Sequence, residues 1–163
     1  MSIEVLANPP SRMDLSPQIR LVPQPARSMV GVRVLLVDDD PADSSLVMDI
    51  LKRHPRVSMA RATDSPTFAL REIESGRLTA DLILLDIHMP RMDGFEFLEQ
   101  IRELPHMAQV PVVFLTTSRL RRDVAKAKRS SASMYLVKPD EYFDLQAGLN
   151  GVIRRAALGR WPN

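Results

Sequence analysis

From residue 32 onward, short apolar runs alternate with longer stretches of helical periodicity, and this alternation constrains the fold more than any other feature. The central run, residues 83–85, has no polar alternation, which is typical of a strand covered on both faces in a parallel sheet. We therefore predict an α/β protein with a doubly wound, five-stranded parallel sheet, helices on both faces and right-handed crossovers. The predicted strands are residues 32–37, 57–62, 83–85, 112–115 and 135–137.

Prolines and a glycine mark where several predicted helices begin or end. Pro41 suits the first turn of a helix that Asp40 caps, and Pro66 suits the first turn of the next. Pro55 ends the first helix, whereas Gly76 fits the position just past the second. Apolar residues at helical spacing are expected to face the core. Three such stripes are Leu46, Val47, Ile50 and Leu51; Leu120, Val124 and Ala127; and Leu145, Leu149, Val152 and Ile153.

A chain of 163 residues has room for one domain with a hydrophobic core, plus a tail. Residues 1–30 hold five of the 13 prolines and show no helical or strand periodicity, which predicts a flexible, Pro-rich N-terminal arm. Alternatively, the apolar residues 19–22 of this arm dock on the domain or on a partner. We assign residues 31–158 to the domain and residues 159–163 to a C-terminal tail.

The composition excludes several classes of protein. There are no cysteines, so disulfides, thiolate metal sites and cysteine catalysis are ruled out, and the cytoplasm is the simplest compartment. We expect no secretory signal, because the first ten residues lack a basic start followed by an apolar core. We also expect no membrane partner, because no apolar run approaches the roughly 20 residues of a membrane span. Residues 119–129 carry six basic side chains against Asp123 but no aromatic residue, so we expect a solvated helix face and no direct contact with nucleic acid.

Polar side chains follow four of the predicted strands directly. They are Asp38 and Asp39, Asp86, Thr116 and Lys138, and all should face the crevice beyond the carboxyl ends of the sheet. Clustered carboxylates suit Mg²⁺, which prefers oxygen ligands, while a lysine and a hydroxyl would complement an anion with several oxygens. The set describes a site where an Asp carboxylate accepts a phosphoryl group, with Mg²⁺ and Lys138 neutralising charge and Thr116 donating a hydrogen bond.

Each of these residues also has a simpler interpretation when taken alone. The acidic residues 38–40 could only cap a helix, Lys138 and Pro139 could only form a turn, and Thr116 could be incidental. It is improbable that all of these simpler interpretations hold at the ends of four strands in one regular chain. The joint pattern therefore favours a phosphoryl-accepting site.

Residues 32–158 resemble the receiver domain of two-component response regulators. The resemblance rests on four motifs in matching order and spacing: VLLVDDDP, LILLDIHMPRMDG, PVVFLTT and YLVKP. It implies a flavodoxin-like receiver fold with strand order 2-1-3-4-5, and phosphotransfer from a sensor histidine kinase or a phosphotransfer protein. The LTTS segment and the Trp near the C-terminus are also similar to single-domain regulators associated with phytochrome-type kinases.

The resemblance gives each residue of the acidic site a role. Asp86 would be the phospho-acceptor and also a Mg²⁺ ligand, Asp39 would be a direct Mg²⁺ ligand, and Asp38 would assist through water. The main-chain carbonyl of His88 would complete the protein ligands. Lys138 would bind a phosphoryl oxygen and the acceptor carboxylate, and the resemblance further implies a cis peptide bond to Pro139.

Thr116 and Tyr135 match the switch pair of the family. The hydroxyl would move toward the phosphoryl group and the aromatic ring would turn inward, which would alter the surface of the fourth helix, fifth strand and fifth helix. His88 and Ser118 occupy positions that tune the loss of phosphate in the family. The His88 imidazole either orders the attacking water or points to solvent, and we favour solvent.

Since only the last helix and the tail follow the receiver motifs, we expect a stand-alone receiver that acts by docking to a downstream target protein. It would be no enzyme beyond the self-catalysed phosphorylation and dephosphorylation of its own Asp. Monomer and homodimer remain open: a dimer would use the fourth helix, fifth strand and fifth helix, with Gly148 and Gly151 allowing close helix approach and Phe143 in the interface.

Two functions from other classes compete with this interpretation. A phosphatase of the haloacid dehalogenase type also combines Asp, Thr, Lys and Mg²⁺, but its nucleophile lies on the first strand in an Asp-x-Asp pair. Here no acidic pair follows Lys138 at a strand end. The other alternative is a receiver-like interaction module that acts without phosphorylation.

Overall fold

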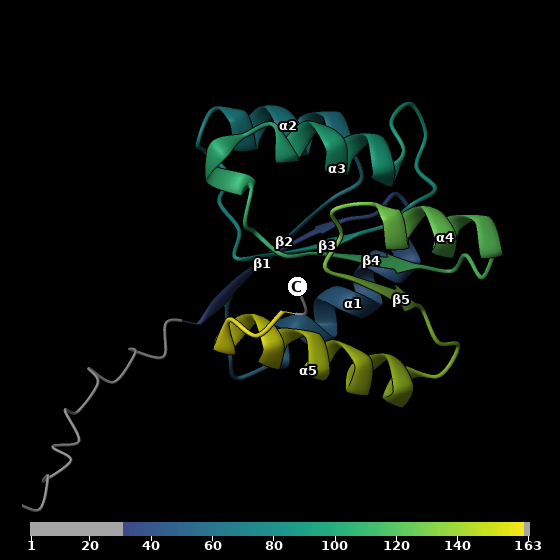
Figure 1. Ribbon diagram of the computed structural model, residues 1–163. Coiled ribbons are helices and arrows are strands. Elements are labelled where there is room, and N and C mark those ends of the chain that lie inside the picture. The colour runs from purple at the N-terminus through teal and green to yellow at the C-terminus, as the bar shows by residue number, and fades with distance from the viewer. Residues whose placement is uncertain (1–30, 162–163) are drawn as a thin grey trace, which may run out of the picture.

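The computed structural model describes residues 31–161, which form a five-stranded parallel sheet flanked by helices (Figure 1). The strand order is β2-β1-β3-β4-β5, which confirms the predicted order and the flavodoxin-like receiver fold. The Pro-rich arm and the last two residues of the tail lie outside the described residues.

The elements follow the predicted alternation closely. The strands are β1 (Val32–Val37), β2 (Val57–Thr63), β3 (Leu82–Leu85), β4 (Val112–Thr116) and β5 (Met134–Val137). The helices are α1 (Pro41–Arg53), α2 (Pro66–Glu74), α3 (Gly94–Arg102), α4 (Arg121–Arg129) and α5 (Tyr142–Leu158), and a short 3-10 helix, η1 (Pro105–Met107), follows α3. Asp40 caps α1 as predicted, because its side chain accepts hydrogen bonds from the backbone N–H groups of Ala42 and Asp43.

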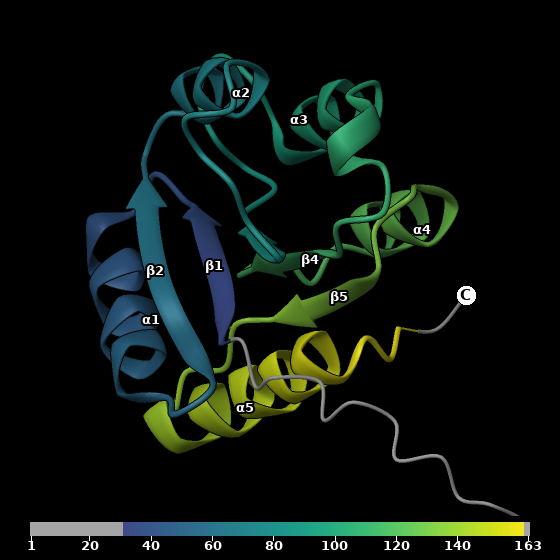
Figure 2. The same cartoon turned by 90° about the vertical axis from the view of Figure 1, so that its left-hand side faces the viewer.

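Two apolar layers lie on opposite faces of the sheet. Helices α2, α3 and α4 cover one face, and α1 and α5 cover the other (Figure 2). Successive side chains of β1 alternate between the layers, with Leu35 and Val37 packing toward α2 and α3, and Val34 and Leu36 toward α1 and α5. The central strand β3 is buried over its whole length, as its apolar run predicts.

Two residues that we expected in the core are exposed instead. Leu46 is 39% exposed because it flanks the buried α1 stripe of Val47, Ile50 and Leu51. Leu120 is 48% exposed because it is the N-cap of α4 and has an extended backbone, so helical spacing does not apply to it.

The two glycines of α5 differ in their surroundings. A Cβ on Gly148 would lie 3.3 Å from Leu136 Cδ2, so this glycine allows α5 to approach the chain's own strand β5. No heavy atom lies within 4 Å of a Cβ built on Gly151. The expectation that Gly148 serves close approach to a partner helix is therefore wrong. Phe143 is 77% exposed.

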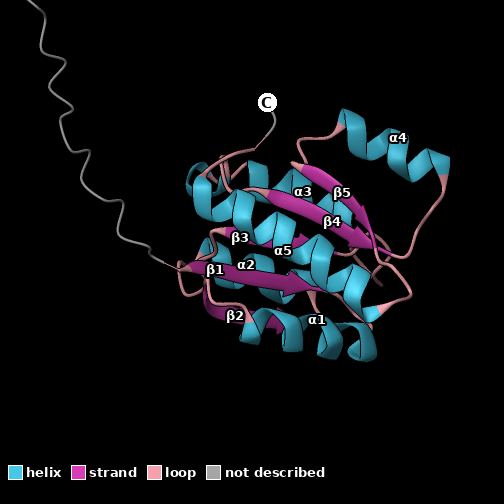
Figure 3. Ribbon diagram, turned by 90° about the horizontal axis from the view of Figure 1, so that it is seen from below, coloured by secondary structure: helices cyan, strands magenta, loops and turns pink. Residues whose placement is uncertain are grey.

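The parallel register brings the carboxyl ends of the strands together (Figure 3). Val37 pairs with Leu85, and Leu85 pairs with Phe114, so the residues that follow β1 and β3 leave the sheet side by side. The residues predicted to carry the chemistry lie at this edge. Within residues 31–161, no helix combines the length and apolar character needed to span a membrane.

Candidate functional site

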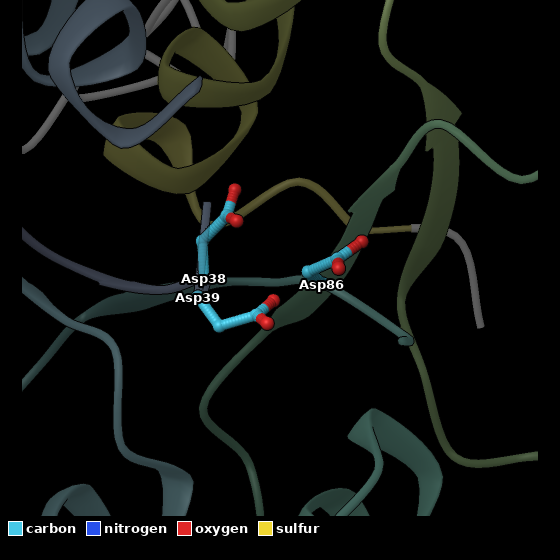
Figure 4. A group of neighbouring side chains, drawn as sticks. All are labelled: Asp38, Asp39 and Asp86. Carbon is cyan, nitrogen blue, oxygen red and sulfur yellow. The ribbon is translucent and has the colours of Figure 1, made fainter. Parts of the chain in front are cut away.

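Three carboxylates meet at the carboxyl ends of β1 and β3 (Figure 4). Asp38, Asp39 and Asp86 each offer one oxygen, and these oxygens lie within 4.8 Å of one another. Asp38 and Asp86 are buried, whereas Asp39 is more accessible. A compact set of oxygen donors with one accessible side is what a hard divalent cation such as Mg²⁺ requires. The residues present therefore fit the cation that the sequence predicts.

Lys138 supplies the positive charge at this site, but through partners that differ from the expected ones. Its Nζ donates hydrogen bonds to Asp38 Oδ2 and Asp43 Oδ2, both at 2.7 Å, and its contact is with these two carboxylates and not with that of Asp86. Sequence analysis missed Asp43, because an acid in the first turn of a helix is most simply explained by the helix dipole.

Burial sets the electrostatics of the Lys138–Asp38 pair. Burial raises the pKa of the Asp38 carboxyl, and the hydrogen bond from Lys138 only partly opposes this effect. Burial alone would lower the pKa of Lys138, but its hydrogen bonds to Asp38 and Asp43 outweigh burial and raise it. The Lys138 ammonium therefore stays charged, whereas burial leaves the charged form of Asp38 less stable than that of a carboxyl in water.

The peptide bond between Lys138 and Pro139 is trans, and none of the described peptide bonds is cis. The expected cis bond is therefore wrong for this structure. The trans form is the lower in energy for an X–Pro bond, by about 0.5–1 kcal/mol. Lys138 reaches both of its carboxylate partners with the trans bond.

The loop after Asp86 is held by the start of α3. The Gly94 N–H donates to the Ile87 carbonyl at 2.9 Å, and a Cβ on Gly94 would overlap the Asp86 carbonyl oxygen. Only glycine leaves room for this approach. Asp93 and Glu96 add a capping box, in which each side chain accepts a backbone N–H of the other residue. The loop that follows Asp86 is thus fixed where it meets the start of α3.

The predicted switch pair converges on Ser118. Thr116 is fully buried, and its Oγ1 accepts a hydrogen bond from the Ser118 N–H at 3.2 Å. Tyr135 donates its hydroxyl to the Ser118 carbonyl at 2.9 Å, and its ring packs against Phe114. Both members of the pair therefore contact one residue of the loop between β4 and α4.

The His88 side chain is bonded to α4. Its ring is 53% exposed, but Nε2 lies 3.0 Å from Asp123 Oδ2, so the imidazole does not simply point into solvent as expected. The Ser118 hydroxyl donates to the same oxygen at 2.5 Å. This hydrogen bond, with the one to His88, holds the pKa of Asp123 below its usual value. Sequence analysis missed Asp123, although its position four residues before the buried Ala127 could have indicated it.

The fold and the arrangement of these residues define a receiver domain, and comparison with known families agrees. The sequence model of the protein family described as response regulator receiver domain matches residues 34–150 of this chain. The chain belongs to this family.

Relatives of two kinds are similar to this chain. Response regulator Rcp1 of Synechocystis is 33% identical over 124 residues, which cover 73% of this chain and 84% of Rcp1. The signal transduction histidine-protein kinase BarA of Escherichia coli is 35% identical over 124 residues, which cover 76% of this chain but only 13% of the kinase. The matched region is thus a small part of some relatives and nearly the whole of others.

Two solved structures extend the likeness to three dimensions. The Mn²⁺-bound form of Rcp1 aligns with a TM-score of 0.66 at 31% identity, covering 74% of this chain and 91% of that one. The phosphorylated cyanobacterial phytochrome response regulator RcpA aligns with a TM-score of 0.70 at 26% identity, covering 82% of this chain and 99% of that one.

Proposed function

We propose that this receiver accepts a phosphoryl group on Asp86 from a sensor histidine kinase or a phosphotransfer protein, and that Mg²⁺ assists. The observation that carries the proposal is the cluster of Asp38, Asp39 and Asp86 beside the buried Lys138 ammonium. An Asp86 oxygen attacks phosphorus, the bond from phosphorus to the donor imidazole breaks, and the donor leaves with that electron pair. Water later hydrolyses the aspartyl phosphate, which releases phosphate and restores the Asp86 carboxylate. This phosphorylation and this hydrolysis are the two reactions that we assign to the protein.

The charges of the site fit this transfer. Mg²⁺, held by Asp39 and Asp86, by Asp38 through water and by the His88 carbonyl, would neutralise charge on the phosphoryl oxygens. Lys138 lies beside this cluster. Burial would lower the pKa of Lys138, but the hydrogen bonds to Asp38 and Asp43, and then the charges of Asp38 and Asp86, raise it. A phosphoryl group on Asp86 would compete with Asp43 for this ammonium. The Mn²⁺ in Rcp1 and the phosphorylation of RcpA support a divalent cation and an acyl phosphate by analogy.

Thr116 and Tyr135 would transmit the phosphorylation of Asp86 to the protein surface. The Thr116 hydroxyl hydrogen can turn toward the phosphoryl oxygens while Oγ1 keeps its bond from the Ser118 N–H. Movement of this loop changes the acceptor of the Tyr135 hydroxyl, and so the surface made by α4, β5 and α5. That surface would bind a downstream target protein in one state only.

Homodimerisation through the same surface is a second proposal, since Phe143 at the start of α5 is 77% exposed. Light scattering with and without beryllofluoride and Mg²⁺ should give a larger mass for the treated protein, and Phe143→Ser should remove the increase. An unchanged mass in the wild type would contradict the dimer but not the phosphorylation.

Intact-mass spectrometry after treatment with acetyl phosphate and Mg²⁺ tests the phosphoryl transfer. The wild type should gain the mass of one phosphoryl group, and Asp86→Asn should gain none. Asp64→Asn is the matched control, because Asp64 follows β2 at the same edge of the sheet. The same adduct in Asp86→Asn would place the phosphoryl group on another residue and reject Asp86 as the acceptor. No adduct in the wild type would reject the proposal in favour of an interaction module that is not phosphorylated.

A further inference from the structure

The buried carboxylate of Asp123 lies outside the predicted site and connects the loop after the acceptor with the loop that carries Ser118. Asp123 of α4 is 7% exposed, and a single oxygen, Oδ2, accepts from Ser118 Oγ at 2.5 Å and lies 3.0 Å from His88 Nε2. His88 lies two residues after the acceptor, in the loop that follows β3, whereas Ser118 lies in the loop that follows β4. The Asp123 carboxylate therefore connects the loop that follows β3 with the loop that follows β4.

The connection continues from Ser118 to the switch pair. The Ser118 main chain donates to Thr116 Oγ1 and accepts from the Tyr135 hydroxyl. The Ser118 hydroxyl also accepts from the Leu120 N–H at 3.3 Å, where α4 lacks any side-chain cap of its own. Hydrogen bonds thus run without interruption from the acceptor loop, through Asp123 and Ser118, to Tyr135.

Apolar packing alone holds α4 weakly. Its buried residues are Asp123 and Ala127, and alanine buries little apolar area. The position of the start of α4 therefore depends on the hydrogen bonds that Asp123 accepts. We propose that Asp123 is a positioning residue that couples the phosphorylation site to Tyr135. The inference rests on the proposed phosphorylation of Asp86 and deepens it.

Two substitutions separate the hydrogen-bond geometry from the charge. Asp123→Ala removes both hydrogen bonds and should uncouple Tyr135 from the acceptor. Asp123→Asn should retain most of the coupling, because both bonds converge on one oxygen and the asparagine carbonyl oxygen can take its place. Ser118→Ala should also uncouple the two sites while leaving intact the main-chain carbonyl that Tyr135 uses.

Fluorine NMR of protein labelled with 3-fluorotyrosine measures the coupling directly, because the chain has only two tyrosines. Addition of beryllofluoride and Mg²⁺ should shift the Tyr135 resonance of the wild type. In Asp123→Ala the shift should fall below half of the wild-type value, although the beryllofluoride concentration at half-saturation should remain similar. Asp144→Ala is the matched control, since Asp144 holds the same first-turn position in α5 but is exposed.

The results distinguish failure of the inference from failure of the proposed function. A full Tyr135 shift in Asp123→Ala, at wild-type occupancy, would overturn the role of Asp123. Absence of beryllofluoride binding to the wild type would instead reject phosphorylation of Asp86. If Asp123→Ala does not fold, a full shift in Ser118→Ala with a folded spectrum overturns the inference on its own.

Discussion

Two helical glycines should respond to the same substitution in opposite ways. A Cβ on Gly94 would meet main-chain atoms of Asp86 and Ile87, which cannot move aside, whereas one on Gly151 would meet nothing within 4 Å. Gly94→Ala should therefore cost about 1–3 kcal/mol of unfolding free energy, as overpacking does. Gly151→Ala should add about 0.5–1 kcal/mol, because alanine favours the helix. Urea unfolding measures both, and equal stability of the Gly94→Ala variant and the wild type would contradict the first.

Sequence analysis identified the residues that directly follow strands but not their partners. Asp86, Thr116 and Lys138 were predictable because each ends an apolar run, and the sheet aligns the strand ends. Asp43 and Asp123 were not, because their roles come from side chains that the fold brings to them. Lys138 and Asp43, for example, are 95 residues apart in the chain. No local pattern encodes such a pair.

At the scale of elements, one ion pair joins the start of β1 to the residue before β3. The Arg33 guanidinium donates to both carboxylate oxygens of Asp81, at 2.9 and 2.7 Å, and the Arg33 N–H donates to one of them as well. The hydrogen bond from the Arg33 side chain is the main reason that the pKa of Asp81 lies below its ordinary value of 3.8. Both side chains are partly exposed, so the pair should contribute about 0.2–1 kcal/mol.

This pair predicts a pH dependence of stability. A depressed pKa means that the contribution is present above pH 3.8 and is lost as the pH falls through the lower value of the folded state. Asp81→Asn should therefore be less stable than the wild type at neutral pH, and the difference should shrink in acid. Urea unfolding at a series of pH values measures it, with Glu99→Gln, an exposed carboxylate of α3, as the control. A difference that stays constant into acid would contradict the assignment.

Helix boundaries were more predictable than helix faces. Capping residues and prolines fixed the starts of α1 and α2, because their effects are local. The faces of α1 and α4 were partly wrong. Leu46 lies within α1 but flanks its buried stripe, whereas the spacing applied to α4 assumed that the helix had already begun at Leu120. Leu120 lies one residue before α4, and Asp123 takes the buried position instead.

At the scale of the whole molecule, Mg²⁺ binding should stabilise the fold. The three clustered carboxylates repel one another, and a cation bound only by the folded state adds about 2.7 kcal/mol at a concentration 100 times its Kd. Calorimetry should show that Mg²⁺ raises the midpoint of thermal unfolding of the wild type. Asp39→Asn should lose most of this increase, whereas Asp64→Asn should keep it. An equal increase in Asp39→Asn would place the cation elsewhere.

The number of strands and their parallel direction followed from the alternation in the sequence, because each crossover requires a helix. The strand order did not follow from the residues themselves. It came from the resemblance to receiver domains, since the pairing of β1 with both β2 and β3 depends on which face each helix covers.

The length of α5 and the position of its first turn give this helix a mechanical property. Helix α5 has 17 residues and begins four residues after Lys138, so it forms a rod about 25 Å long with one end near the acidic cluster. A tilt of about 5° at that end would displace the other end by about 2 Å. A small rotation of α5 near Lys138 would therefore produce a larger displacement at the C-terminal end of the helix.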